Sequence, residues 1–258
     1  MSVSTQPARP LYRTPSIFRD FPHLVAAEST RHGGVSPAPF DSLNLGLNTD
    51  DTPENVAENR RRFWQALSID PTRVAASYQI HGNEVLTVCQ PGDYQGFDAL
   101  ITCTPGIALA VTIADCTPVL IYDSARKAIG AIHAGWRGTV GGIVAKTVAQ
   151  MSREFGTDPT DCFAYIGTCI DECSFEVGDE VAEHFSEQHK YFNQRAGKFY
   201  VDLKKANYDQ LKGAGLADSN IQLSLHSTAL DVADYFSHRL EKGKTGRMLA
   251  CISMVENG

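Results

Sequence analysis

The sequence has no apolar run long enough to cross a membrane. Its longest apolar stretch covers 107–114 and ends at Asp115, whereas a spanning helix needs about 20 residues. The first 21 residues also lack the apolar centre of a signal peptide. The seven cysteines are scattered, and none has the Cys-x-x-Cys spacing of a zinc ribbon or a thioredoxin-type site. These absences, together with the odd number of thiols, predict a cytoplasmic protein with reduced cysteines.

An excess of positive charge is also absent. The 23 Lys and Arg residues against 30 Asp and Glu residues give a net charge of -7, which argues against electrostatic binding to nucleic acid or to an anionic membrane. Hydrophobic residues make up 43% of the chain, so disorder is excluded for most of it. Because Gly and Pro are not pooled in a linker and no repeat occurs, we predict a single domain over 1–258, with 1–20 as an extended N-terminal arm.

The apolar periodicity predicts a mixture of helices and strands. Thr52 can cap a helix over 52–67, Pro53 fits its first turn, and the apolar residues that follow recur at helical spacing. Short apolar runs broken by Gly, Pro and Asp predict buried strands. The expected strands are 84–89, 98–103, 107–114, 118–122, 128–134, 162–167, 221–225 and 247–255, and the other expected helices are 138–155, 178–188 and 202–213. So many adjacent strands favour an α+β or α/β fold over simple βαβ alternation.

Two strand ends and one turn carry side chains that could bind a metal. If the three apolar runs between 107 and 134 form a meander, Cys116 and His133 lie at one edge of the sheet, where functional loops gather. His81 lies in a glycine-containing turn before another strand. Two imidazoles and a thiolate can hold Zn²⁺ with a fourth position open for water, whose pKa the metal would lower. Alternatively, Cys116 is itself a nucleophile and a histidine is its base.

Two further charged segments have simpler interpretations. The segment 135–142 opens a predicted helix, where free N–H groups and Arg137 could bind an anion, although a plain glycine turn fits equally well. It lacks the lysine and the spacing of a P-loop, so the sequence does not predict a nucleoside triphosphate site. A basic stretch near the C-terminus is interpreted as a solvated turn and contains Arg239, Lys242, Lys244 and Arg247.

Several separated motifs resemble those of the YfiH family, which is also described as the laccase-like polyphenol oxidase family. They lie in the family's order between about 30 and 250 and read TRHGGVSPAPFDSLNLG, QIHGNEV, ALAVTIADCTPVL, GAIHAGWRGTVGGI, IGTCIDECSFEVGDEV and TGRM. The resemblance implies an α+β fold, a single layered α/β/β/α sandwich of the cysteine-hydrolase kind. It also implies a zinc site formed by His81, Cys116 and His133, at which Cu²⁺ is a possible substitute.

The resemblance further implies a zinc-dependent purine nucleoside phosphorylase with adenosine deaminase activity. Its substrates would be phosphate and adenosine, inosine, guanosine or methylthioadenosine, and the three metal ligands would form the catalytic centre. Arg31, Asn44 and Asp115 are implied to contact the substrate. In this view the guanidinium of Arg31 orients the phosphate through a bidentate fork, and Asp115 is a polar neighbour of the metal ligand.

Three alternatives remain open at this stage. Copper-dependent phenol oxidation follows from the family's older description, but eight histidines without a His-x-His pair argue against a multicopper cluster. A second alternative is a peptidoglycan-editing hydrolase acting on UDP-MurNAc-L-Ser. A third is a non-enzymatic binding module with a structural metal, which needs a fourth ligand from Cys169, Cys173 or His226. His226-Ser227-Thr228 also occupies a place where the family commonly has Cys-Thr, so His226 could alter substrate choice or metal affinity if this segment lines the pocket.

Overall fold

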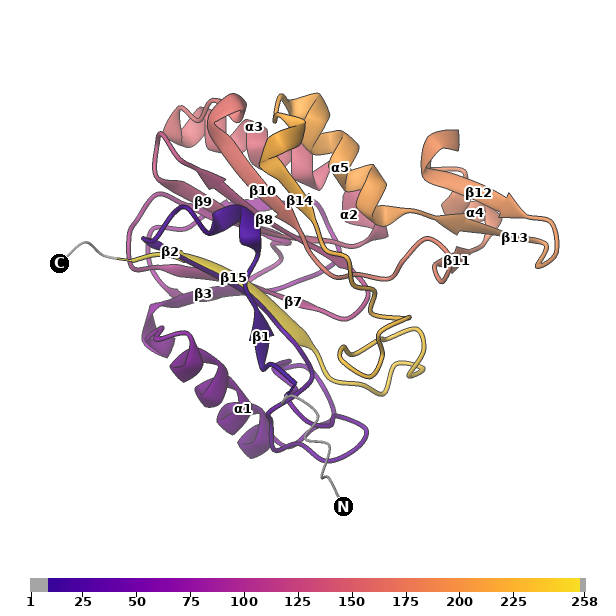
Figure 1. Ribbon diagram of the computed structural model, residues 1–258, viewed down its shortest axis with the longest axis horizontal. Coiled ribbons are helices and arrows are strands. Elements are labelled where there is room, and N and C mark those ends of the chain that lie inside the picture. Colours follow the sequence, from indigo (N-terminus) through magenta and orange to yellow (C-terminus); the bar gives the residue numbers. More distant parts are fainter. Residues whose placement is uncertain (1–8, 256–258) are drawn as a thin grey trace, which may run out of the picture.

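The computed structural model describes residues 9–255, which form two six-stranded sheets, a small three-stranded sheet and flanking helices (Figure 1). The first sheet has the order β1 (Tyr12–Arg13), β2 (Leu24–Ser29), β15 (Met248–Met254), β7 (Ala108–Ile113), β3 (Val74–Tyr78) and β5 (Gly92–Gln95). The second has the order β14 (Ile221–Leu223), β10 (Cys162–Ile166), β8 (Thr117–Asp123), β9 (Ala128–Ala134), β6 (Ala99–Thr102) and β4 (Val85–Thr87).

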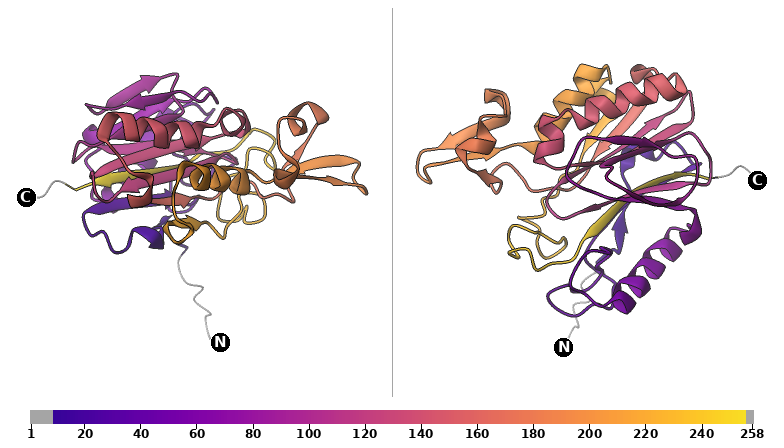
Figure 2. Two further views of the ribbon diagram at one scale, coloured as in Figure 1. Left: turned by 90° about the horizontal axis from the view of Figure 1, so that it is seen from above. Right: turned by 180° about the vertical axis from the view of Figure 1, so that it is seen from behind.

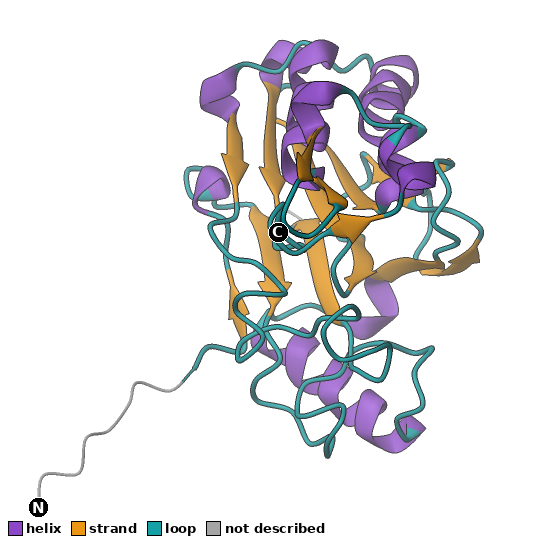
Figure 3. Cartoon of the chain, turned by 90° about the vertical axis from the view of Figure 1, so that its right-hand side faces the viewer, coloured by secondary structure: helices purple, strands orange, loops and turns teal. Residues whose placement is uncertain are grey.

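Helices lie on the two outer sides of the paired sheets, as Figures 1 and 3 show. The helix α1 (Pro53–Ala66) packs on the first sheet, and α3 (Ile143–Phe155) and α5 (Leu203–Ala214) pack on the second. A separate apolar cluster, with Leu109 and Leu120 among its members, fills the space between the sheets. The predicted mixture of helices and strands is therefore confirmed.

The small sheet projects from one end of the molecule (Figure 2). It consists of β11 (Glu176–Val177), β13 (Lys198–Val201) and β12 (Lys190–Asn193), and the short helices α2 (Trp136–Val140) and α4 (Asp179–Ala182) lie near its base. Its apolar cluster includes Ile170, Val177 and Phe185. The remaining single turns are 3-10 helices, namely η1 (Ser16–Phe18), η2 (Pro71–Arg73), η3 (Pro159–Asp161), η4 (Glu187–His189) and η5 (Asp218–Asn220).

Local chemistry explains where the predicted helices hold and where they fail. At the start of α1 the Thr52 hydroxyl accepts a hydrogen bond from the backbone N–H of Asn55, as an N-cap should. The expected helix over 138–155 is instead two helices, because Gly142 adopts a φ of +74° that breaks the α-helical path. The expected helix over 178–188 is also shorter and covers only Asp179–Ala182.

The predicted meander is wrong in one respect that matters for the site. β8 and β9 form the expected antiparallel hairpin, but β7 belongs to the other sheet, where it pairs with β15 and β3. The chain passes from one sheet to the other at Asp115, whose φ of +84° is rare for a residue with a side chain. Apolar runs alone do not say which sheet a strand joins, so this crossing was invisible in the sequence.

The expected N-terminal arm is only partly described. Residues 1–8 lie outside the described range, whereas β1 pairs with β2 and Phe18 is buried, so residues 12–18 pack on the domain. Among residues 9–255, none of the helices has the length and apolar character that crossing a membrane would require.

Candidate metal centre

The three candidate ligands meet where the chain passes between the two sheets. His81 lies between β3 and β4, Cys116 lies between β7 and β8, and His133 lies near the end of β9. One ligand atom from each residue lies within 4.8 Å of those of the other two. The Cys116 Sγ is 3.8 Å from the His81 Nδ1. The structure therefore brings together the three side chains that the sequence singled out.

Asp98, a residue that the sequence analysis did not select, orients both histidines. Its buried carboxylate accepts a hydrogen bond of 2.8 Å from the His133 Nδ1, which leaves the other ring nitrogen of His133 free to face the centre. The same carboxylate accepts hydrogen bonds from the backbone N–H groups of Ile80, His81 and Gly82 at 3.2, 3.0 and 2.8 Å. These contacts hold His81 at a φ of +57°. The sequence signal that could have identified Asp98 is its position directly before the apolar strand β6.

The thiol of Cys116 and the imidazole of His133 change each other's protonation. Burial alone would raise the pKa of Cys116, but the charge of His133 and hydrogen bonds from both histidines lower that pKa below its usual value. Burial would lower the pKa of His133, but Cys116 and Asp98 raise it instead. The centre therefore favours the thiolate, which is the form that binds metals and attacks electrophiles.

The donor set fits a divalent metal ion with an open coordination position. Two imidazoles and a thiolate are the ligands that zinc takes in catalytic sites. A Cβ at Gly135 would lie 3.0 Å from the His81 Nδ1 and 3.2 Å from the Cys116 Sγ, so glycine keeps this side of the centre open. No further His, Cys, Asp or Glu side chain within 9–255 joins the group.

The centre opens into a cavity of about 570 Å³, a volume within the range typical of small-molecule sites. Asp115 lines this cavity. Its carboxylate accepts hydrogen bonds from the Thr228 hydroxyl and from the backbone N–H of Arg239. Apolar side chains form much of the wall and include Leu47, Ala76, Tyr78, Ala110, Ile170, Phe175 and Leu249.

Arg31 and Asn44 are placed differently from what the resemblance implies, because neither is among the described residues that line the cavity. The Arg31 Nε donates to the Asp41 carbonyl, its Nη1 lies 3.2 Å from a Glu241 carboxylate oxygen, and its guanidinium lies over the Phe236 ring. Asn44 is fully buried in hydrogen bonds to its own loop. The polar groups of both side chains are therefore bonded within the protein.

Three other arginines line the cavity and were missed, namely Arg60, Arg239 and Arg247. Arg239 and Arg247 belonged to the stretch that was interpreted as a solvated turn, but both line the cavity, and Arg247 lies directly before β15. Arg60 was missed although it follows Val56 by four residues and precedes Phe63 by three, which places it on the buried face of α1. A charged residue at an apolar position of the helical repeat was the signal.

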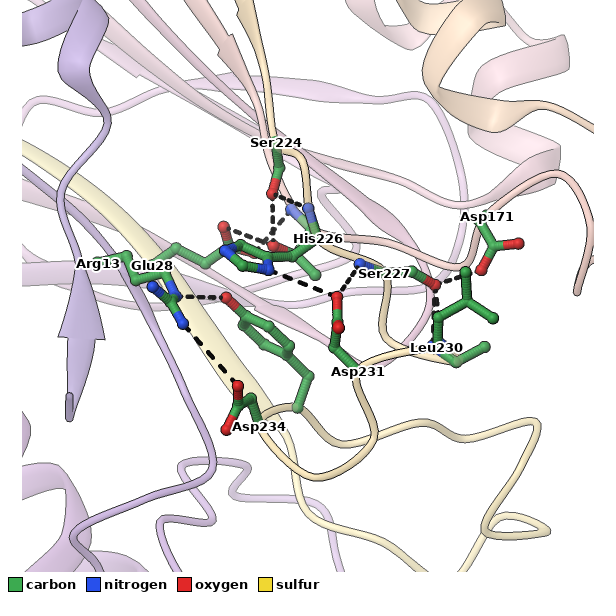
Figure 4. Close-up of polar contacts among 12 residues, drawn as sticks. Arg13, Glu28, Asp171, Ser224, His226, Ser227, Leu230, Asp231 and Asp234 are labelled. Carbon is green, nitrogen blue, oxygen red and sulfur yellow. Dashed lines mark hydrogen bonds and ion pairs between the residues drawn. The ribbon is translucent and has the colours of Figure 1, made fainter. Parts of the chain in front are cut away.

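The remaining candidates lie elsewhere. Arg137 lies over the Trp136 ring, at 4.4 Å from its centroid, and does not line the cavity among the described residues. His226 lies in a network of polar side chains around Asp231 and Ser227 (Figure 4). Cys169 is buried, with its thiol directed to the Ile170 carbonyl.

A mixed α/β fold in which two imidazoles and a thiol meet in the lining of a cavity defines a class of protein with a candidate metal-binding centre. Residues 25–255 match the model of the family described as "Multi-copper polyphenol oxidoreductase laccase". The chain belongs to this family.

Curated relatives and solved structures agree with this assignment. A protein of Deinococcus radiodurans named "Purine nucleoside phosphorylase" is 41% identical over 252 residues, which cover 97% of this chain and 95% of that protein. "Purine nucleoside phosphorylase YfiH" of Escherichia coli K12 is 35% identical, with 90% of this chain and 94% of that protein covered. The crystal structure of YlmD from Geobacillus stearothermophilus superposes with a TM-score of 0.87 at 35% identity and covers 92% of this chain and 93% of that one.

Proposed function

We propose that this protein is a metal-dependent purine nucleoside phosphorylase. The observation that carries the proposal is the cluster of His81, Cys116 and His133 in the lining of a cavity of about 570 Å³. The names of the relatives from Deinococcus radiodurans and Escherichia coli support the choice of reaction. The substrates are then a purine nucleoside and inorganic phosphate.

The cavity offers the environment that this reaction needs. The apolar wall formed by Tyr78, Ile170 and Phe175 can hold the flat face of a purine. A phosphate oxygen forms a bond to C1′ of the ribose while the C1′–N9 bond breaks, and its electron pair leaves with the base, which takes up a proton. In this proposal phosphate rather than water is the nucleophile at C1′.

The metal we propose is zinc, held by His81, Cys116 and His133. When bound, such an ion supplies a Lewis acid that polarises a substrate oxygen or water. The protein's own contribution is orientation: Asp98 holds the ring of His133 and the backbone of His81, and Gly135 leaves room beside the thiolate. The absence of a fourth ligand within 9–255 supports a catalytic metal over a structural one.

The test is phosphorolysis of inosine by the zinc-loaded protein, with hypoxanthine and ribose 1-phosphate separated and identified. We expect both products in equal amounts, none without phosphate, and none after zinc is removed by a chelator. A zinc-loaded preparation that releases no free base from inosine, adenosine, guanosine or methylthioadenosine contradicts the proposal.

Adenosine deamination is the second activity we propose for the same centre. The open coordination position supports it, because an activated water could attack C6 of the purine and displace ammonia. Adenosine without phosphate should then yield inosine and ammonia. The lowered pKa of Cys116 supports a variant of this idea, in which its thiolate is itself the nucleophile. Activity that survives complete metal removal would favour that variant.

Copper is the alternative metal, because Cu²⁺ binds most such sites more tightly than Zn²⁺. Elemental analysis of protein purified without added copper separates the two metals. Copper at one ion per chain, with oxidation of a phenol by that preparation, would favour the oxidase named in the family description.

A further inference from the structure

We propose that Arg60 and Arg247 form a phosphate-binding subsite in the wall of the cavity. This inference rests on the proposed phosphorolysis for its biological meaning, but the observations behind it do not. Both side chains line the same cavity as His81, Cys116 and His133. Both carry guanidinium groups whose hydrogen-bonding capacity the described residues leave mostly unused.

The guanidinium of Arg60 makes one hydrogen bond, from Nη1 to the carbonyl of Leu45 at 2.9 Å. Its flat face lies 5.9 Å from the centroid of the Trp64 ring. Burial lowers the pKa of Arg60, and the nearby charge of Asp93 raises it by a smaller amount. No carboxylate of residues 9–255 lies within the 4.0 Å of an ion pair with Arg60.

The guanidinium of Arg247, like that of Arg60, donates only to backbone carbonyls among the described residues. Its Nη1 donates to the carbonyls of Thr245 and Gly246, both at 2.9 Å, and its Nε and Nη2 have no acceptor among the described residues. The backbone of Arg247 is bonded to Asn44 and Leu45, and a Cβ at Gly46 would lie 2.6 Å from the Arg247 Cγ. The backbone of Leu45 therefore accepts a hydrogen bond from the Arg60 guanidinium and donates one to the Arg247 carbonyl, which joins the two cavity-lining arginines through one residue.

The charges around this pair favour an anion. Asp93 and Asp115 are the carboxylates that line the cavity, and Asp115 already accepts two hydrogen bonds from the protein. Arg239 also lines it, but its Nη1 is used by the Glu176 carbonyl. The charge of Asp93 acts on Arg60, and the charges of Asp115 and Cys116 act on Arg247, but neither guanidinium forms an ion pair within 4.0 Å among residues 9–255. Burial disfavours both half-buried cations, and a bound anion would offset that cost. A phosphate oxyanion matches the planar fork of each guanidinium.

Two sources could provide this chemistry, namely inorganic phosphate as a substrate and the phosphate of a sugar 1-phosphate as a product. Both present the same oxyanion, so one subsite serves the reaction in either direction. A nucleoside diphosphate such as UDP, the headgroup of the editing substrate, presents two phosphates and requires more room along the wall.

The experiment is a direct binding measurement on the zinc-loaded full chain without nucleoside. Inorganic phosphate, ribose 1-phosphate and UDP are titrated separately by calorimetry, into the wild type and into Arg60→Gln and Arg247→Gln. The matched control is Arg61→Gln, the same substitution one residue along α1, at an exposed side chain that pairs with Glu58. Arg60→Lys and Arg247→Lys serve if a glutamine variant fails to fold.

We expect each substitution at Arg60 or Arg247 to weaken phosphate binding by about 10-fold or more, and Arg61→Gln to leave it unchanged. In the phosphorolysis assay the KM for phosphate should rise with little change in the KM for the nucleoside. Wild-type phosphate affinity in both variants overturns the subsite even if phosphorolysis is observed. Phosphate binding that depends on both arginines, without release of free base, keeps the subsite and rejects the proposed reaction. Tighter and equally arginine-dependent binding of UDP rejects the assignment to inorganic phosphate and sugar phosphate.

Discussion

The cavity wall and the surroundings of Arg31 use the same side chain in opposite ways. Arg31 is 9% exposed, and its guanidinium is matched by backbone carbonyls, by Asp41 and Glu241, and by the Phe236 ring. Arg60 and Arg247 each use one nitrogen on backbone carbonyls and keep the rest of the fork unused. Unused bonding capacity beside a cavity indicates ligand binding, whereas complete satisfaction indicates a structural role.

The same contrast distinguishes cysteines. Cys116 lies between two imidazoles and has a lowered pKa, whereas burial raises the pKa of Cys251 to about 12. Cys251 is fully buried in the apolar cluster that joins the first sheet to α1. An inert thiol of this kind is a small apolar side chain for packing purposes. The environment of each cysteine, rather than their number, therefore decides which one is chemically active.

The largest effect should follow from Cys116→Ala. We expect catalysis to fall by about a thousandfold or more, because the ligand that supplies the negative charge of the centre is lost. The fold should survive, since Cys116 is not part of an apolar cluster. Activity assays and metal analysis check the first expectation, and the thermal unfolding midpoint checks the second. Cys173→Ala, at an exposed thiol, is the matched control. An unfolded Cys116→Ala protein would indicate a structural metal instead.

Arg31→Gln tests whether Arg31, unlike Arg60 and Arg247, has a structural role. Removing a buried cation leaves Glu241 and several carbonyls without their donor, so the free energy of unfolding should drop by about 3 kcal/mol. Chemical denaturation against Arg61→Gln measures this loss. The KM for phosphate of the folded fraction should stay near that of the wild type. A stable Arg31→Gln protein with a raised phosphate KM would instead restore Arg31 to the role that the resemblance implies.

Much of the fold was predictable because apolar runs mark buried strands directly. Runs such as 107–114 and 128–134 appear as β7 and β9 with boundaries shifted by about one residue. The sheet that each strand joins was not predictable. β7 and β8 have equally apolar sequences, but β7 belongs to the first sheet and β8 to the second. The break at Gly142 was visible as a pair of glycines, but helical periodicity continues across it.

The site was predictable in its ligands and unpredictable in their supports. His81, Cys116 and His133 were accessible through their residue types and the family motifs, although the sheet argument for two of them was wrong. Asp98 acts through contacts made at residues 80–82 and 133, which are distant in sequence. Arg60 carried a local signal in its helical position, whereas Arg247 looked like any solvent-exposed cation in a basic turn.

Asp98→Asn tests whether orientation of the ligands matters as much as their identity. The amide keeps one acceptor oxygen, but its NH₂ group cannot accept the hydrogen bonds that the second carboxylate oxygen takes, so the His133 Nδ1–H and the three backbone N–H groups can no longer all be satisfied. We expect zinc affinity to fall by about 10- to 100-fold, as is usual for such supporting residues. Competition with a chromophoric chelator measures it without any activity assay. Asp93→Asn removes the same charge from the cavity rim and should stay within threefold of the wild type.

The smallest effects should come from His226 and Cys173, which the sequence analysis named as candidates for a fourth metal ligand. His226 forms a 3.4 Å ion pair with Asp231 in a partly exposed network (Figure 4). The thiol of Cys173 is exposed. His226→Ala should cost at most about 1 kcal/mol of unfolding free energy, since exposed ion pairs contribute little. Both His226→Ala and Cys173→Ser should keep one zinc ion per chain and the affinity of the wild type. Loss of the metal in either variant would mean that its side chain reaches the centre in solution as a fourth ligand. That result would close the open coordination position and remove the main argument for a catalytic metal.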